Sequence, residues 1–158
     1  MTHGPSLAEP AFPGDDGRVY PELAEALGDP ARVLAVFGGV RVFVPIVAML
    51  GEDHVPGQGD KNADMAAVLM TGADGRKGLL AFSSLETMAR WNPEARPVPV
   101  WGQAAAISAL DEGADAILLD LASPHFQPID GDDVRQLAAG RALVRTAAGL
   151  AWVESREG

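Results

Sequence analysis

Cysteine is absent from this 158-residue chain, which excludes disulfides, thiolate nucleophiles and metal centres built on sulfur. Basic residues are also scarce: 12 Lys and Arg stand against 22 Asp and Glu, and the formal net charge is −10. An acidic chain repels a phosphate backbone. The basic residues occur singly, apart from the adjacent Arg76 and Lys77, so we expect no nucleic-acid partner.

The chain has no apolar run long enough to span a bilayer. Its first 18 residues lack the basic and apolar regions of a signal peptide. We therefore expect no membrane association and a location in the cytoplasm. Arginine far outnumbers lysine, and alanine and glycine are abundant. This bias is typical of a GC-rich bacterial genome, such as an actinobacterial one.

Established catalytic motifs are missing as well, since the chain contains no GxSxG, no HExxH and no P-loop. Ser83 and Ser84 precede a predicted helix and are interpreted as its caps. One Gly-rich loop carries several oxygen and imidazole groups, but their spacing matches no calcium loop: Glu52, Asp53, His54, Asp60 and Asp64. We expect no metal, no cofactor and no enzymatic activity.

Length and a hydrophobic content of 47% predict one domain with a single core. Residues 1–18 are rich in Pro, Gly and acid and are expected to form a flexible N-terminal arm. Residues 19–158 then form the domain. Residues 40–50 are β-branched and apolar, which predicts a buried strand. Pro45 within that run predicts an edge, a bulge or a break.

Turn and cap signals predict the other elements. Asp29 caps a helix beginning at Pro30, and Asp74-Gly75 is a strong hairpin signal. Further predicted helices cover residues 20–27, 85–91, 102–112 and 130–138. The helix over 85–91 is expected to begin with a capping box of Ser83 and Glu86. The helix over 102–112 is expected to direct Ala105, Ile107 and Leu110 inward. Predicted strands cover residues 65–71, 77–82, 116–121 and 126–129. Residues 143–153 are expected to form either a strand pair or a strand with a turn that packs Leu150 or Trp152. Hairpins interrupted irregularly by helices predict an α+β domain, with a mostly antiparallel or mixed sheet flanked by helices.

Four residues are candidates for a binding surface: Trp91, Asn92, Arg96 and Trp101. Trp and Arg are enriched at interface hot spots, and these lie in or near a proline-stiffened loop. A purely structural role is the alternative and the favoured interpretation. In that case Trp91 fills the core, and Arg96 pairs with a carboxylate such as Asp120.

Residues 60–124 resemble the N-terminal domain of the SseB family, a group of small bacterial proteins. The resemblance rests on a series of local patterns in order along the chain: Lys61 with Met65, Ala81-Phe82, the capped helix from Ser84 to Trp91, Arg96-Pro97, an Ala-rich helix over 103–113, and Leu119-Asp120. It implies an α+β domain of the SseB N-terminal type. These patterns are structural in kind, so they imply kinship and no reaction.

The resulting expectation is a domain that binds another protein or itself, with a twofold homodimer as the form of self-association. The alternative is a regulatory site for an anionic metabolite, formed by Trp91, Asn92 and Arg96. In that alternative, Arg96 would hold the anion.

Overall fold

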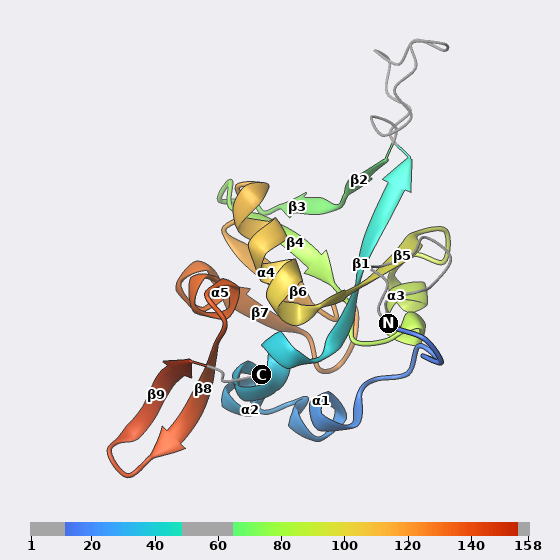
Figure 1. Ribbon diagram of the computed structural model, residues 1–158. Helices are drawn as coiled ribbons and strands as arrows, with labels where there is room; N and C mark the ends of the chain where they lie inside the picture. The colour runs from blue at the N-terminus through green and yellow to red at the C-terminus, as the bar shows by residue number, and fades with distance from the viewer. Residues whose placement is uncertain (1–11, 49–64, 155–158) are drawn as a thin grey trace, which may run out of the picture.

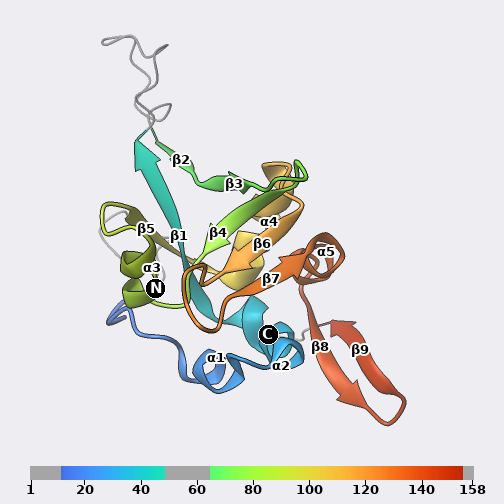
Figure 2. The same ribbon diagram turned by 180° about the vertical axis from the view of Figure 1, so that it is seen from behind.

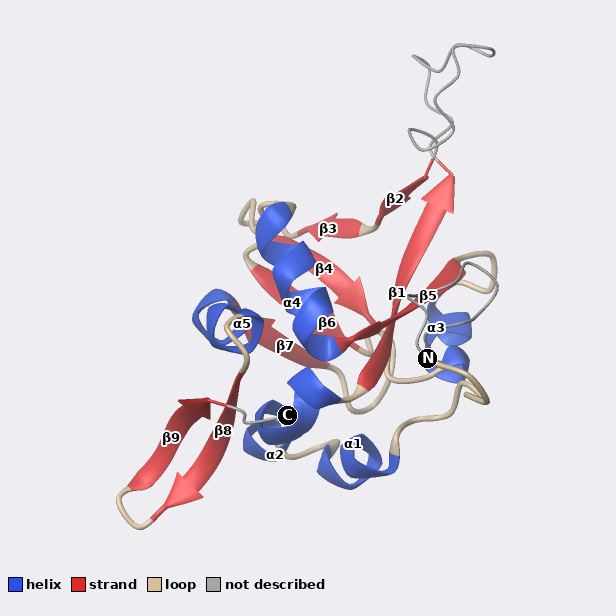
Figure 3. Cartoon of the chain, viewed as in Figure 1, coloured by secondary structure: helices blue, strands red, loops and turns tan. Residues whose placement is uncertain are grey.

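The computed structural model describes residues 12–48 and 65–154, which form five α-helices, one 3-10 helix and nine strands (Figures 1 and 3). The strands lie in three sheets: β2 (Met65–Ala67), β1 (Arg41–Ala48) and β5 (Arg96–Trp101); β3 (Leu69–Thr71), β4 (Lys77–Ala81), β6 (Ala116–Leu119) and β7 (Gln127–Asp130); and β8 (Arg141–Thr146) with β9 (Gly149–Glu154). All pairs are antiparallel except β4 with β6. The expected α+β fold with a mixed sheet is confirmed.

The helices are α1 (Pro21–Ala26), α2 (Pro30–Val36), α3 (Leu85–Trp91), α4 (Gly102–Asp111) and α5 (Gly131–Ala138), and the 3-10 helix η1 (Phe37–Gly39) follows α2. The side chain of Asp29 accepts a hydrogen bond from the N–H of Arg32, so α2 is capped as predicted. Within the described residues, no helix has the length and apolar character needed to cross a membrane.

The cap of α3 differs in part from the prediction, because Ser84 caps the helix as predicted but Ser83 and Glu86 do not form its capping box. Ser84, not Ser83, is the N-cap residue, and the capping box is completed by Thr87 instead of Glu86. Ser84 Oγ accepts from the N–H of Thr87 at 3.0 Å. Ser83 cannot serve as the cap because its buried hydroxyl is bonded to Asp120.

The inward face of α4 also differs from the prediction. Ala105, Ala106 and Ala109 are fully buried, whereas Ile107 and Leu110 are exposed to 44% and 37%. The helix starts so close to η1 that a Cβ on Gly102 would lie 1.8 Å from the carbonyl oxygen of Phe37. That contact fixes the helix with its small residues against the core, and the larger side chains are turned outward.

The described part of the chain has two apolar clusters, one on each face of the sheets. Leu79 and Ala81 of β4 belong to the larger cluster, whereas Leu80 and the following Phe82 belong to the smaller one. This alternation is the period of two expected for a strand covered on both sides. Helices α4 and α5 contribute to the larger cluster, and α3 contributes Met88 to the smaller one. Figure 2 shows α4 behind β4 and β6.

Pro45 lies within a continuous strand between β2 and β5, but the predicted break is present in the ladder on one side of it, where neither Phe82 nor β2 pairs with Pro45. Two residues before it, Phe43 exchanges two backbone hydrogen bonds of 2.8 Å with Phe82, on the side away from β5. By the alternation of an antiparallel ladder, the nitrogen of Pro45 also faces away from β5. Pairing with β2 begins one residue later, at Ile46. The missing N–H therefore falls between two sets of ladder bonds.

The stretch predicted as one strand over residues 65–71 is two strands, because β2 pairs with β1 whereas β3 pairs with β4. Val68 is the single residue between them. The predicted turn is confirmed: Gly75 has a φ of 87°, and Asp74 accepts from the N–H of Arg76. The predicted C-terminal strand pair is the hairpin of β8 and β9, which projects from the rest of the molecule (Figure 1).

Candidate functional site

A charged side chain lies in the interior at the first residue of β1. Arg41 has a fully buried side chain, a position that arginine occupies only when its charge is paired. Its guanidinium donates to the backbone carbonyls of Ser83, at 3.0 Å, and Arg18. It also lies over the rings of Tyr20 and Phe43, with Cζ 5.0 and 4.2 Å from their centroids.

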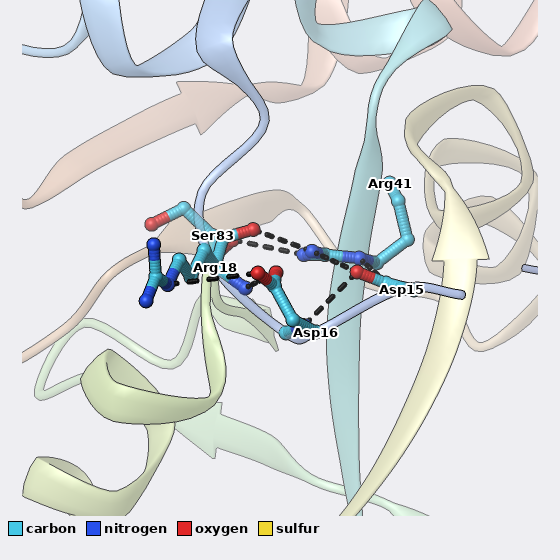
Figure 4. Close-up of polar contacts among 6 residues, drawn as sticks. Asp15, Asp16, Arg18, Arg41 and Ser83 are labelled. Carbon is cyan, nitrogen blue, oxygen red and sulfur yellow. Dashed lines mark hydrogen bonds and ion pairs between the residues drawn. The ribbon is translucent and has the colours of Figure 1, made fainter.

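The counter-ion of Arg41 is Asp15, from the N-terminal segment (residues 12–18). Arg41 Nε donates to Oδ2 at 2.7 Å and Nη2 donates to Oδ1 at 3.0 Å, which is a bidentate pair (Figure 4). The side chain of Asp15 is only 14% exposed. Hydrogen bonds from the Arg41 guanidinium hold the pKa of Asp15 below its usual value, against the opposing effect of burial.

Aromatic side chains surround the approach to this ion pair. Trp101 ends β5 and is 45% exposed, and its ring meets Phe12 edge-on with centroids 4.7 Å apart. Tyr20 meets the same indole at 6.2 Å. A pocket of about 540 Å³ lies between the N-terminal segment and Trp101, and Asp15, Arg18 and Tyr20 are part of its lining.

A second polar cluster continues from Ser83 into the domain. Asp120 is fully buried and accepts three hydrogen bonds: from the N–H of Ser83 at 2.7 Å, from its hydroxyl at 2.6 Å, and from the hydroxyl of Thr87 at 3.0 Å. Asp120 also has a φ of 58°, in the left-handed region that aspartate tolerates better than most residues. Because its hydroxyl is buried and bonded, Ser83 holds loops together and is closed to solvent in this structure.

The two clusters meet at Ser83, whose carbonyl accepts from Arg41 while its N–H and hydroxyl donate to Asp120. The end of β4, the start of α3 and the end of β6 are thereby tied to the start of β1. No buried side-chain nitrogen or oxygen in the described residues lacks a partner. The arrangement holds a carboxylate firmly against a buried guanidinium.

The predicted binding residues lie at opposite ends of β5. Trp91 is half-buried and stacks on Phe82 at 5.6 Å, within the smaller apolar cluster. The side-chain oxygen of Asn92 accepts from the N–H of Glu94 at 2.8 Å and closes the turn after α3. Arg96 is exposed at the start of β5, about 17 Å along the strand from Trp101. The four residues therefore form no single cluster.

The pairing expected between Arg96 and Asp120 is wrong, since Asp120 is bonded to Ser83 and Thr87 instead. The acidic loop considered for a metal, with Glu52, Asp53, His54, Asp60 and Asp64, lies outside the described residues. The described residues contain no group of three or more potential metal ligands.

The family model of the SseB protein N-terminal domain matches residues 19–136. The chain belongs to the SseB family. Arg41, Ser83, Trp101 and Asp120 all lie within the matched SseB domain, whereas Asp15 and the hairpin of β8 and β9 lie outside it. Neither the curated proteins nor the solved structures contain a match to this SseB chain.

Sequence reasoning missed Arg41, Asp15 and Tyr20. One signal was available: Arg41 is a charged residue among the apolar residues 40–44, and a charge in a buried strand requires a partner. The identity of that partner had no local signal, because Asp15 lies 26 residues away in a segment whose composition is typical of a loose arm.

Proposed function

We propose that this SseB domain is a non-enzymatic bacterial module of the cytoplasm that binds another protein or a second copy of itself through the surface around Trp101. The observation that supports this best is the half-exposed indole of Trp101, beside a pocket lined by the N-terminal segment. A large aromatic side chain at the rim of a pocket is the usual anchor of a protein interface.

Association through side chains is favoured over extension of a sheet at β5. In the described structure β5 lies at the end of its sheet, and its Pro97 and Pro99 pair with Pro45 and Phe43 of β1. Phe43 directs its backbone groups away from β5, so these are non-hydrogen-bonded pairs. The nitrogens of Pro97 and Pro99 therefore face outward without a hydrogen to donate, which blocks strand addition.

The test compares wild type with Trp101→Ala in light scattering at increasing concentration and in capture from bacterial lysate. Leu150→Ala is the matched control, because Leu150 is 52% exposed but lies on the distant hairpin. We expect Trp101→Ala to lose the self-association or the captured protein, and Leu150→Ala to keep it. A monomer at all concentrations that captures nothing, or equal behaviour of the two variants, would refute the proposal.

The alternative function is binding of an anionic metabolite. The buried pair of Arg41 with Asp15 favours it, since it demonstrates that this fold accommodates a carboxylate against a guanidinium. For the site expected at Trp91, Asn92 and Arg96, the test is Arg96→Ala, because Arg96 is exposed and its loss should leave the fold intact. A thermal shift produced by a dicarboxylate or a phosphate ester, and removed by Arg96→Ala, would support it. An unchanged melting temperature with every anion would exclude that site.

A further inference from the structure

We propose that Arg41, held in place by the Ser83 carbonyl, forms with Trp101 a peptide-binding site that recognises an aspartate side chain, and that the N-terminal segment occupies this site as a ligand from the same chain. The partner would be a protein carrying an acidic segment with an aromatic residue three positions before the aspartate, as Phe12 precedes Asp15. This inference rests on the proposed function and specifies its ligand.

The N-terminal segment lies on the domain as a bound peptide does. It contributes one aromatic contact, Phe12 to Trp101, one bidentate carboxylate, Asp15 to Arg41, and the carbonyl of Arg18, which also accepts from Arg41. A backbone bond from the N–H of Leu85 to the carbonyl of Gly17, at 2.9 Å, completes the attachment. Pro13, Gly14 and Asp16 are exposed, so little apolar surface of the segment is buried. A segment held mainly by a few polar contacts opens more readily than a core element.

The receptor and its occupant belong to different parts of the chain. Arg41, Ser83 and Trp101 lie within the residues that match the SseB domain, whereas Phe12 and Asp15 precede them. A fully buried guanidinium without a counter-ion is strongly destabilising. A carboxylate at this position is therefore strongly favoured, and the contacts at Arg41 do not depend on which chain supplies it.

The surroundings select a peptide over a free anion. The ring of Tyr20 lies next to the guanidinium, and Trp101 meets that ring edge-on, so both provide aromatic surface beside the carboxylate site. The N–H of Leu85 donates to the carbonyl of Gly17, so the site also binds the backbone of the peptide two residues after its aspartate. An inorganic anion would use Arg41 alone and leave these groups without contacts.

Gly17 fixes the geometry of the attached segment. Its φ is 81°, and a Cβ there would lie 2.3 Å from Cδ1 of Leu85. Substitution by alanine is therefore unfavourable for the backbone in the bound conformation, whereas the exposed side chain of Leu85 can turn away from the added Cβ. We expect Gly17→Ala to weaken the attachment of the segment while leaving the charges of Asp15 and Arg41 in place.

The experiment uses the full chain as wild type, Asp15→Asn, Gly17→Ala and Asp16→Asn. Asp16→Asn is the matched control, since it removes the same charge from the neighbouring residue, which pairs with exposed Arg18. The probe is the end-blocked peptide of residues 12–18, and a second peptide carries asparagine in place of Asp15. Binding is measured by titration calorimetry after circular dichroism has established the fold of each variant.

In wild type, the attached segment competes at an effective concentration of about millimolar, so the added peptide binds weakly. We expect Asp15→Asn to bind the peptide at least about tenfold more tightly than wild type, because its own segment no longer competes through the carboxylate. Gly17→Ala should also bind the peptide more tightly than wild type does, and Asp16→Asn should bind it as weakly as wild type. The asparagine peptide should bind Asp15→Asn at least about tenfold more weakly than the aspartate peptide, because it lacks the charge-assisted pair.

The proposal is overturned if folded Asp15→Asn binds neither peptide, binds both equally, or gains no more than Asp16→Asn. If Asp15→Asn does not fold, Gly17→Ala decides, and no gain there means that the pair of Arg41 with Asp15 is a structural ion pair only. Loss of a captured protein in Trp101→Ala, together with no peptide binding, would leave the interaction module standing and refute this ligand. Peptide binding without any captured protein would support this ligand and would refute the proposed capture of a partner protein.

Discussion

The hydroxyl of Ser83 donates to Oδ2 of Asp120 at 2.6 Å, while the N–H of Ser83 donates to Oδ1 at 2.7 Å. The carboxylate of Asp120 thus accepts from both donors of Ser83, which lies two residues beyond the end of β4. The N–H of Asp120 in turn donates to the carbonyl of Ala81 at 2.9 Å. The loops after two parallel strands, β4 and β6, are held together by this exchange.

Asp120→Ala should destabilise the domain by about 3 kcal/mol, because it leaves the buried N–H and hydroxyl of Ser83 without an acceptor. The measurement is urea unfolding followed by circular dichroism. Asp115→Ala is the control, since Asp115 also accepts a backbone bond, from the N–H of Lys77, but is exposed. We expect a loss of about 1 kcal/mol or less there. Equal losses would contradict the importance assigned to the buried cluster.

The two candidate tryptophans should separate in stability. Trp91→Ala removes a ring stacked on Phe82 in an apolar cluster and should cost about 3 kcal/mol. Trp101→Ala should cost about 1 kcal/mol, because nearly half of that side chain is already in water. Chemical denaturation of both variants checks this. A larger loss for Trp101→Ala would mean that its contacts with Phe12 and Tyr20 are part of the fold.

The pair of Asp15 with Arg41 predicts a pH dependence. Because the pKa of Asp15 is lowered by folding, the pair stabilises the domain above the unfolded value of 3.8 and loses its effect as the pH falls through the folded pKa. Wild type should thus be more stable than Asp15→Asn at pH 7, and the difference should vanish in strong acid. Asp133 has a raised pKa, mainly from burial, but it is common to both proteins and cancels.

Thermal unfolding of wild type and Asp15→Asn between pH 2 and 7 would measure this difference, with Asp16→Asn as the comparison. Asp16 is largely exposed, and its effect should be small at every pH. A difference for Asp15→Asn that persists unchanged at the lowest pH would show that the ion pair is not its cause.

The prolines of β5 predict a gain of association on substitution. Replacing Pro97 and Pro99 with threonine restores two outward N–H groups on an end strand, which is the usual template for strand addition. We expect concentration-dependent oligomers in light scattering. Pro93→Thr, in the loop after α3, is the control and should stay as wild type. Monomeric behaviour of the double variant would indicate that the edge of β5 is protected by other means.

Local signals accounted for much of the fold. Asp29 with Pro30 and Asp74 with Gly75 each act within a few residues, and both were predicted correctly. The face of α4 was predicted wrongly because hydrophobicity favoured Ile107, whereas the close approach of Gly102 to η1 decides the orientation. That approach joins segments distant in sequence, so helical periodicity could not reveal it.

The polar clusters were beyond reach for the same reason. Ser83 is of a residue type preferred at helix caps, and only the proximity of Asp120, 37 residues later, gives it another role. Asp15 resembles any acid of a loose terminal stretch until β1 places Arg41 beside it. Charge and residue type were visible in the sequence, whereas the pairing depends on the tertiary fold.

The single residue between β2 and β3 has a mechanical consequence. The three-stranded and four-stranded sheets are joined by the two backbone bonds between Phe43 and Phe82. The bond from the N–H of Leu80 to the carbonyl of Val68 continues the pairing of β3 with β4 up to the residue that precedes β3. Because so few backbone bonds link the two sheets, any relative motion of the sheets must break or strain them. The exchange rates of the amide hydrogens of Phe43 and Phe82 therefore report whether the two sheets move as one body.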